Sequence, residues 1–272
     1  MRNAGNNRTM NAKESLALEK FIKDIIVKAG KQTLKYYGKA KVKYTKENES
    51  DFVTEADLAS NRMIVNSIRK KYPSHGIISE EEPVQKQDKE YVWIIDPIDG
   101  TYSYAHKSPM YGVMIAITKD SHVIMASIYL PYFDELYFAR KNKGAYLNGK
   151  RVRCSQKKDM RNSIGVGTLV PLGERKRQIE RFFAKSTQKY WLTSTAAIAN
   201  DTADVARGVR DWFFSPHLWD GIWDFAAPSL ILEESGCKVT DFDGNDWNLK
   251  SGSEFIAANP ILHNKIMKII NR

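Results

Sequence analysis

The sequence predicts a layered α/β fold, and three observations support this prediction. Near the start, over 13–37, apolar residues recur at the spacing of an amphipathic helix. Over 110–147, short β-rich runs are separated by turn signals. Through the second half of the chain, expected strands and helices alternate, which is the pattern of sheets covered by helices.

The N-terminal part is expected to hold two helices after a disordered start. Residues 1–12 are polar and rich in Asn, a composition that does not support a packed element. The first helix, 13–37, ends at a glycine, and the second, 54–72, ends at a proline, which cannot continue a helix. Between them, residues 42–44 indicate a weak strand that leads into a mobile charged loop.

The remaining elements are read from β-rich runs, helical periodicity and turn residues. The expected strands are 91–95, 110–118, 122–131, 135–141, 144–147, 163–169, 211–214 and 238–240. The expected helices are 174–184, 196–207, one that opens near Asp224, and 260–270. Because the sequence shows no repeat and no boundary that would divide it, residues 13–272 are interpreted as one domain.

The stretch 80–101 carries the first functional signal. An apolar run in it indicates a buried strand, which the Asp96-Pro97 pair is expected to end. Asp96 and Asp99 can then converge on one point, where Gly100 exposes backbone N–H donors. Such oxygen ligands suit a hard cation such as Mg2+. Asp-Pro and Asp-Gly are also ordinary turn dipeptides, so the stretch taken alone fits a simple turn equally well.

A second signal lies far downstream, over 223–236. Its sequence indicates a helix that opens near Asp224 and stops at Gly236, which places Asp224 at a helix N-terminus. Two carboxylates about 5 Å apart repel each other by roughly 3 kcal/mol at an effective dielectric near 20. If Asp224 meets Asp96 and Asp99, bound cations would remove that repulsion, so such a meeting would favour a metal site.

At these residues the chain resembles the inositol monophosphatase family of Mg2+-dependent, lithium-sensitive phosphatases. One signature of that family is similar to 93–101 and the other to 223–236. Two weaker matches, 51–57 and the pair Glu80-Glu81, occur in the family's order. The resemblance covers the chain from about Glu14 to the C-terminus. It implies an α-β-α-β-α sandwich of the inositol monophosphatase and fructose-1,6-bisphosphatase type, usually found as a homodimer.

The resemblance also implies a role for each matching residue. Metal ligands for two or three Mg2+ ions are implied at Glu80, Asp96, the Ile98 carbonyl, Asp99 and Asp224. Asp57 would support a more loosely held metal or its waters. Thr101, together with Glu80, would orient the attacking water, so Glu80, Thr101 and Asp57 form the implied catalytic set. Substrate-binding positions are implied at Gly100, Thr101, Ser194, Ala196 and Asp224.

The chain departs from the family pattern where the substrate would lie. Inositol-specific members carry a second Thr and Asn-Phe after the first signature, whereas this chain has 102–104 as Tyr-Ser-Tyr. The acidic residue that contacts inositol hydroxyls has no clear equivalent near Ser215. The expected substrate is therefore inositol monophosphate or a similar sugar or polyol phosphate. The open alternatives are a 3′(2′),5′-bisphosphate nucleotidase, a fructose-1,6-bisphosphatase and a histidinol phosphatase.

Several residues near the signatures are expected to have other roles. Lys46 aligns loosely with a mobile-loop lysine of the family, and a solvated lysine is an equal alternative. Asp220 mimics the second signature but lacks the following Ala-Ala, so it is assigned to the rim. His106 and His217 are interpreted as structural, because a zinc site needs several soft or imidazole ligands at set spacing.

Composition limits the class of protein. The 272 residues are 42% hydrophobic and 27% charged, which is ordinary for a globular chain. No long apolar run indicates a signal peptide or a membrane span. Cys154 and Cys237 fit two unpaired thiols in a reducing, cytoplasmic setting.

The formal net charge of +10 points to anionic partners. The Lys- and Arg-rich runs lack interleaved aromatics, so they are interpreted as solvated faces that steer a phosphorylated small molecule. A hypothesis of another class is that the metal site is vestigial and the basic faces bind nucleic acid. The complete set of carboxylates counts against it.

Overall fold

The computed structural model describes residues 11–45, 52–83, 87–167, 175–185, 190–216, 221–252 and 254–271. The helices are α1 Ala12–Leu34, α2 Glu55–Lys71, α3 Thr101–Ala105, α4 Lys176–Lys185, α5 Ile198–Ala206, α6 Ile222–Ser235 and α7 Pro260–Ile270. The strands are β1 Val42–Thr45, β2 Phe52–Thr54, β3 Gly76–Ser79, β4 Tyr91–Asp99, β5 Gly112–Lys119, β6 His122–Leu130, β7 Glu135–Arg140, β8 Gly144–Leu147, β9 Lys150–Arg151, β10 Ile164–Gly167, β11 Trp191–Thr193, β12 Trp212–Pro216, β13 Lys238–Thr240 and β14 Glu254–Ala258.

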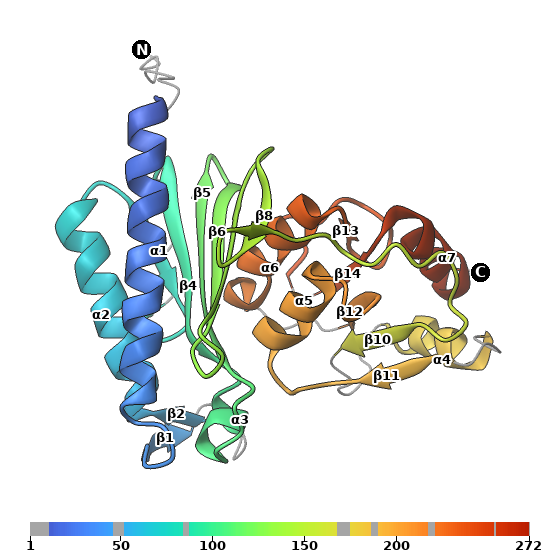
Figure 1. The fold of residues 1–272 in the computed structure, drawn as a ribbon, viewed down its shortest axis with the longest axis horizontal. Coiled ribbons are helices and arrows are strands. Elements are labelled where there is room, and N and C mark those ends of the chain that lie inside the picture. The colour runs from blue at the N-terminus through green and yellow to red at the C-terminus, as the bar shows by residue number, and fades with distance from the viewer. Residues whose placement is uncertain are drawn as a thin grey trace.

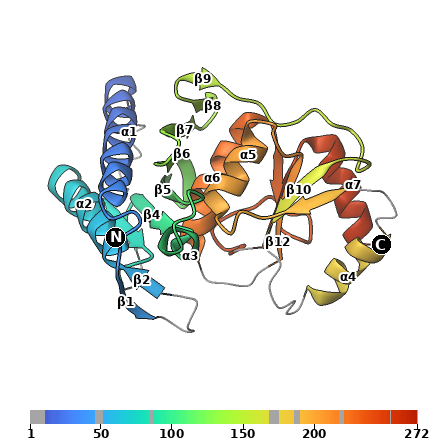
Figure 2. The ribbon, with the colours of Figure 1, turned by 60° about the horizontal axis from the view of Figure 1, so that its bottom comes forward.

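Helices and sheets alternate in five layers (Figure 1). Helices α1 and α2 cover a seven-stranded sheet of order β3-β4-β5-β6-β7-β8-β9. Its other face packs against α5 and α6, which separate it from a five-stranded sheet of order β11-β10-β12-β14-β13 (Figure 2). Helices α4 and α7 cover the outer face of the second sheet (Figure 1). The predicted α-β-α-β-α sandwich is confirmed.

The alternation of side chains along each strand divides the core between the layers. In β4, Ile95 joins the cluster formed with α1 and α2, whereas Ile94 joins the cluster formed with α6. In β12, Phe213 packs toward the middle helices and Phe214 toward α4 and α7. Successive residues of a strand point to opposite faces, so each sheet is buried on both sides. This double burial explains why both strands read as continuous apolar runs.

Strand β4 continues through Asp96-Pro97 to Asp99, so the prediction that the strand ends at Asp96 was wrong. The pairing of β4 with β5 shifts register between Asp96 and Asp99, and its pairing with β3 reaches only Ile95. Pro97 therefore lies where the ladder does not require its missing N–H, as is usual for proline at a bulge. The irregularity brings Asp96 and Asp99 to the same end of the sheet.

The other expected elements are present with shifts at their ends. Six short elements have no counterpart among the predicted ones: helix α3 and the strands β2, β3, β9, β11 and β14. Each is at most five residues long, and each of these strands is defined by its pairing with another strand. Helix α1 begins at Ala12 because Asn11 forms a capping box with Glu14. The expectation of disorder over 1–12 is therefore wrong at its last two residues, which cap and begin the helix. Residues 1–10 lie outside the described part of the chain. No described helix combines the length and hydropathy that a bilayer-spanning segment requires.

The C-terminal end of α6 holds the turn between β7 and β8. The Glu234 carboxylate accepts backbone N–H groups from Asn142 at 2.6 Å, from Lys143 at 3.0 Å and from Gly144 at 2.6 Å. The neighbouring Glu233 makes only an ion pair, at 2.7 Å, with the Lys141 ammonium among the described contacts. Of these two adjacent glutamates, Glu234 therefore fixes the backbone of the turn, whereas Glu233 contacts only a side chain among the described residues.

Replacing Glu234 by Ala is expected to lower the free energy of unfolding by about 1–3 kcal/mol, because three N–H groups lose a charged acceptor. The matched control, Glu233→Ala, removes a half-exposed ion pair and is expected to cost less than about 1 kcal/mol. Urea unfolding followed by fluorescence measures both. Equal losses in the two variants would contradict this role for Glu234.

Candidate active site

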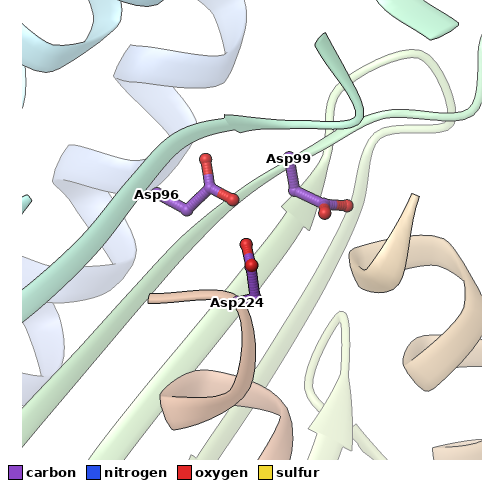
Figure 3. A group of neighbouring side chains, drawn as sticks. All are labelled: Asp96, Asp99 and Asp224. Atoms are coloured by element: carbon purple, nitrogen blue, oxygen red, sulfur yellow. The ribbon is translucent and has the colours of Figure 1, made fainter. Parts of the chain in front are cut away.

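Three carboxylates from distant parts of the chain meet at the end of β4. Asp96 and Asp99 belong to this strand, and Asp224 lies in the first turn of α6. One carboxylate oxygen of each lies within 4.8 Å of the others. Asp96 and Asp224 approach each other from the strand and the helix, and Asp99 lies beside them (Figure 3). The structure thus brings together three of the predicted metal ligands.

The start of α6 places Asp224 in this group. The helix follows Gly221, where a Cβ would lie only 2.7 Å from Oδ2 of Asp224. It ends at Gly236, which has a φ of 100° in the left-handed region that favours glycine. Helix α6 packs along the seven-stranded sheet, so its N-terminal turn lies over the end of β4 (Figure 3).

The electrostatics of this cluster favour a cation. Burial, and then the charges of Glu80, Asp99 and Asp224, raise the pKa of Asp96 well above its usual range. Among the described residues, Oδ1 of Asp96 is buried and has no hydrogen-bond partner. A buried carboxylate oxygen without a partner is costly, and a divalent cation removes that cost. The donors are all hard oxygens, which fit Mg2+ rather than the nitrogen- and sulfur-rich sites of zinc.

Asp99 also caps a helix. Its Oδ1 accepts the N–H of Ile198 at 3.1 Å, and its Oδ2 accepts the N–H of Ala199 at 2.7 Å. The N-cap residue of α5, Ala197, has no side chain able to do this. Burial raises the pKa of Asp99 to about 7, although these two N–H groups lower it. Each oxygen keeps a second lone pair, so capping and metal binding are compatible.

Asp57 and Thr101 form a second polar pair. Asp57 is the third residue of α2, and its Oδ2 accepts the Thr54 backbone N–H at 2.9 Å and the Thr54 hydroxyl. The Thr101 hydroxyl lies 3.0 Å from Oδ1 of Asp57 and 3.0 Å from the Ile98 carbonyl. Burial raises the pKa of Asp57 to about 7. The resemblance implies that Thr101 acts together with Glu80. The structure shows in addition that the Thr101 hydroxyl is hydrogen-bonded to Asp57.

Gly100 brings the end of β4 against the turn 194–197. Its φ is 81°, and a Cβ there would lie 2.7 Å from Cβ of Ala197 and 3.2 Å from the Met110 carbonyl. A larger residue at Gly100 is therefore excluded by both conformation and space. The turn contains Ser194 and Ala196, the two residues expected to line the substrate pocket, so that expected wall adjoins Gly100.

Glu80, which directly follows β3, lies beside the carboxylate cluster. Its N–H donates a hydrogen bond to the Ile95 carbonyl at 3.2 Å, and its charge raises the pKa of Asp96.

Two other residues discussed in the sequence analysis do not belong to the carboxylate cluster. The His106 ring stacks on Tyr102 with centroids 4.2 Å apart, and Ser215 is buried in β12. Three residues with an expected or alternative role lie outside the described part of the chain: Lys46, His217 and Asp220.

Both cysteines are free and buried, which confirms the prediction of two unpaired thiols.

One buried acid near the site was not predicted. Asp201 in α5 is only 2% exposed and contacts the turn 194–197. The sequence signal was an acid early in a helix, which by itself indicates only a favourable interaction with the helix dipole. Its burial depends on packing that the sequence pattern does not reveal.

Fold and site together define a class: a five-layer α/β protein with a carboxylate cluster suited to divalent cations. The model of the inositol monophosphatase family matches residues 16–272, and the chain belongs to that family. A "Fructose-1,6-bisphosphatase/inositol-1-monophosphatase" of Thermotoga maritima is 32% identical over 248 residues, which are 91% of this chain and 93% of the relative. The "Nus factor SuhB" of Escherichia coli is 34% identical over 225 residues, which are 80% and 82% of the two chains. The solved structure of a Thermotoga maritima IMPase superimposes with a TM-score of 0.81 at 30% identity, covering 93% of this chain and 96% of that one.

Proposed function

We propose that the protein is a Mg2+-dependent phosphomonoesterase that hydrolyses inositol monophosphate or a similar small sugar or polyol phosphate. The observation that carries the proposal is the meeting of Asp96, Asp99 and Asp224 within 4.8 Å, with one buried oxygen of Asp96 left without a partner among the described residues. Membership of a family of phosphatases, and a relative named for two sugar-phosphate activities, support the reaction type.

The residues of the site divide into metal ligands and groups that act on water and phosphate. The proposed ligands for two or three ions share hard oxygen donors: Glu80, Asp96, the Ile98 carbonyl, Asp99 and Asp224. Bound Mg2+ supplies a water of lowered pKa and stabilises the leaving alkoxide. The Thr101 hydroxyl donates a hydrogen bond to Asp57, so its oxygen can accept a hydrogen bond from the attacking water. When that water gives up a proton to Thr101, the Thr101 hydroxyl proton would pass to Asp57. The N–H groups of Gly100 and Thr101 receive the phosphate.

The turn 194–197 forms the proposed wall for the alcohol part of the substrate. A Cβ at Gly100 would lie 3.5 Å from the Ala196 carbonyl, so a group bound to a phosphate at Gly100 would reach this turn, which also contains Ser194. One observation favours the bisphosphate nucleotidase alternative: Tyr102, next to Thr101, is 51% exposed although His106 stacks on its ring, and an exposed aromatic ring can contact a base. Near Ser215 the chain has no clear equivalent of the acidic residue with which family members contact inositol hydroxyls. A panel of phosphorylated alcohols therefore tests the specificity.

Phosphate release from a panel of inositol, fructose, histidinol and nucleotide phosphates tests the proposal. We expect release that requires Mg2+, stops in EDTA, returns on adding Mg2+ and is inhibited by lithium. The preferred substrate is expected to be an inositol or polyol monophosphate. No Mg2+-dependent release from any member of the panel would overturn the proposed function. A nucleotide preferred at least tenfold would select the nucleotidase alternative.

A second candidate function is a role in transcription, because some relatives are named Nus factors. The observation in its favour is a basic segment that comprises β9 and the chain leading to β10. Its cations make no ion pair with a described residue: Lys150, Arg151, Arg153, Lys157, Lys158 and Arg161. Such a segment would bind RNA through phosphates, so the affinity would fall steeply with salt. Fluorescence anisotropy with a labelled single-stranded RNA from 50 to 200 mM salt, on the order of the range in which such contacts weaken, is the test.

The remaining proposals concern assembly and location. A homodimer is proposed from the resemblance, and a cytoplasmic location is proposed from the two free cysteines. Light scattering coupled to gel filtration measures the assembly, and a mass of one chain would refute the dimer.

A further inference from the structure

A buried carboxylate outside the metal cluster holds the turn 194–197. Oδ1 of Asp201 accepts the Thr195 N–H at 3.1 Å, and Oδ2 lies 3.4 Å from the Ser194 hydroxyl. Asp201 is almost fully buried in the first part of α5, and burial raises its pKa to about 6, although its bonds to Thr195 and Ser194 lower it. Burying an acid is costly, so the contacts that it makes need an explanation.

The turn that Asp201 holds has a strained backbone. Ala196 has a φ of 59°, in the left-handed region that its Cβ disfavours. Such a conformation persists only where the surroundings determine it. Here the Ala196 N–H bonds the Ser194 hydroxyl at 3.1 Å, the Thr195 hydroxyl bonds the Ala197 carbonyl at 3.1 Å, and the Ser103 hydroxyl of α3 lies 3.4 Å from the Thr195 carbonyl. Asp201 fixes the Thr195 N–H within this network.

The same turn leads directly into the donors that hold Asp99. Ile198 and Ala199 follow Ala197 and give their N–H groups to the two oxygens of Asp99. The direction of these N–H groups depends on how the chain leaves the turn. Ala197 also contacts the position of Gly100. Hydrogen bonds and the backbone of the turn therefore connect Asp201 to a carboxylate of the cluster.

We propose that Asp201 is a positioning residue for the metal centre and for the adjoining substrate wall. By fixing the turn 194–197, it sets the N–H groups of Ile198 and Ala199 that orient the Asp99 carboxylate. The proposal rests on the proposed function, since it takes Asp99 as a metal ligand. A purely structural role would affect stability alone, whereas a positioning role also affects the affinity for the cation.

Three variants of α5 separate these roles. Asp201→Ala removes both acceptor oxygens, whereas Asp201→Asn keeps an oxygen for the Thr195 N–H. Asp204→Ala is the matched control on the same helix, where it breaks ion pairs with Arg207 and Arg210. We expect Asp201→Ala to weaken Mn2+ or Mg2+ binding, measured by titration calorimetry, by about 10–100-fold, as is typical for partners that orient a ligand. Asp201→Asn is expected to stay within about threefold of the wild type, and Asp204→Ala within about twofold, on the same reasoning.

The melting temperature is recorded for each variant, so that lost stability is not mistaken for lost affinity. Cation affinity of Asp201→Ala equal to that of Asp204→Ala, with wild-type binding intact, would overturn the positioning role and leave the proposed function standing. Failure of the wild type itself to bind Mg2+ or Mn2+ would overturn the proposed function instead. If Asp201→Ala does not fold, Ser194→Ala takes its place, because it removes one exposed hydroxyl of the same network. An affinity loss of about threefold is then expected, and unchanged affinity would refute the proposal.

Discussion

Replacing Asp96 by Asn is expected to lower kcat/KM by about 1000-fold or more, because several kcal/mol of charge stabilisation would depend on the cations that this carboxylate is proposed to hold. Asn has nearly the same shape, so the β4 backbone has no reason to move. The neutral amide, however, would be a weaker ligand for Mg2+ than the carboxylate. Phosphate release at saturating Mg2+ measures the loss.

The same substitution is expected to raise the melting temperature in EDTA. Asp96 is buried beside Asp99 and Asp224. Without cations the folded chain must either bear the repulsion between carboxylates, about 3 kcal/mol for two at about 5 Å, or bear the cost of protonating Asp96, whose pKa is raised by burial and by its neighbours. Removing the carboxylate relieves either cost, so the variant gains stability while it loses activity. Asp243→Asn is the control, because it changes only an exposed ion pair with Arg175. Unchanged kcat/KM in Asp96→Asn would contradict the assignment of the metal site.

The layered fold could be predicted from the sequence because burial on both faces leaves a clear pattern. The run 91–95 is an example. Helix α7, which buries only one face, also has the predicted bounds, 260–270. Pro97 shows the limit of this reasoning. Proline favours a strand end, but a register shift and a short partner strand allow β4 to continue. Such a compensation depends on neighbouring strands, which local sequence signals do not describe.

The candidate site was predictable to a similar extent. Spacing alone brought Asp96 and Asp99 together, and the resemblance was needed to add Asp224. The Thr54 to Asp57 spacing is that of a capping box, so one half of the Asp57 environment follows from local sequence. Its contact with Thr101 requires α2 to pack on β4, where the Ser60 hydroxyl bonds the Pro97 carbonyl at 3.0 Å. Contacts of this kind arise only in the folded chain.

Replacing Thr101 by Val is expected to lower kcat by about 100- to 10,000-fold with little change in KM, which is the usual cost of losing a proton-transfer group. Val has the shape of Thr and lacks only the hydroxyl, so the end of β4 keeps its packing. The Thr101 hydroxyl oxygen lies 3.0 Å from Asp57, and without it the attacking water has no oriented acceptor at this position.

Affinity for Mg2+ distinguishes this loss from that of Asp96→Asn. The Thr101 side chain is not a proposed ligand, so titration calorimetry is expected to give wild-type affinity for Thr101→Val and reduced affinity for Asp96→Asn. Thr101→Ser, which keeps the hydroxyl, is expected to retain activity within about tenfold. A fall in Mg2+ affinity that parallels the fall in kcat would show that Thr101 supports the metal centre rather than the attacking water. Wild-type kcat in Thr101→Val would remove Thr101 and its bond to Asp57 from the mechanism altogether.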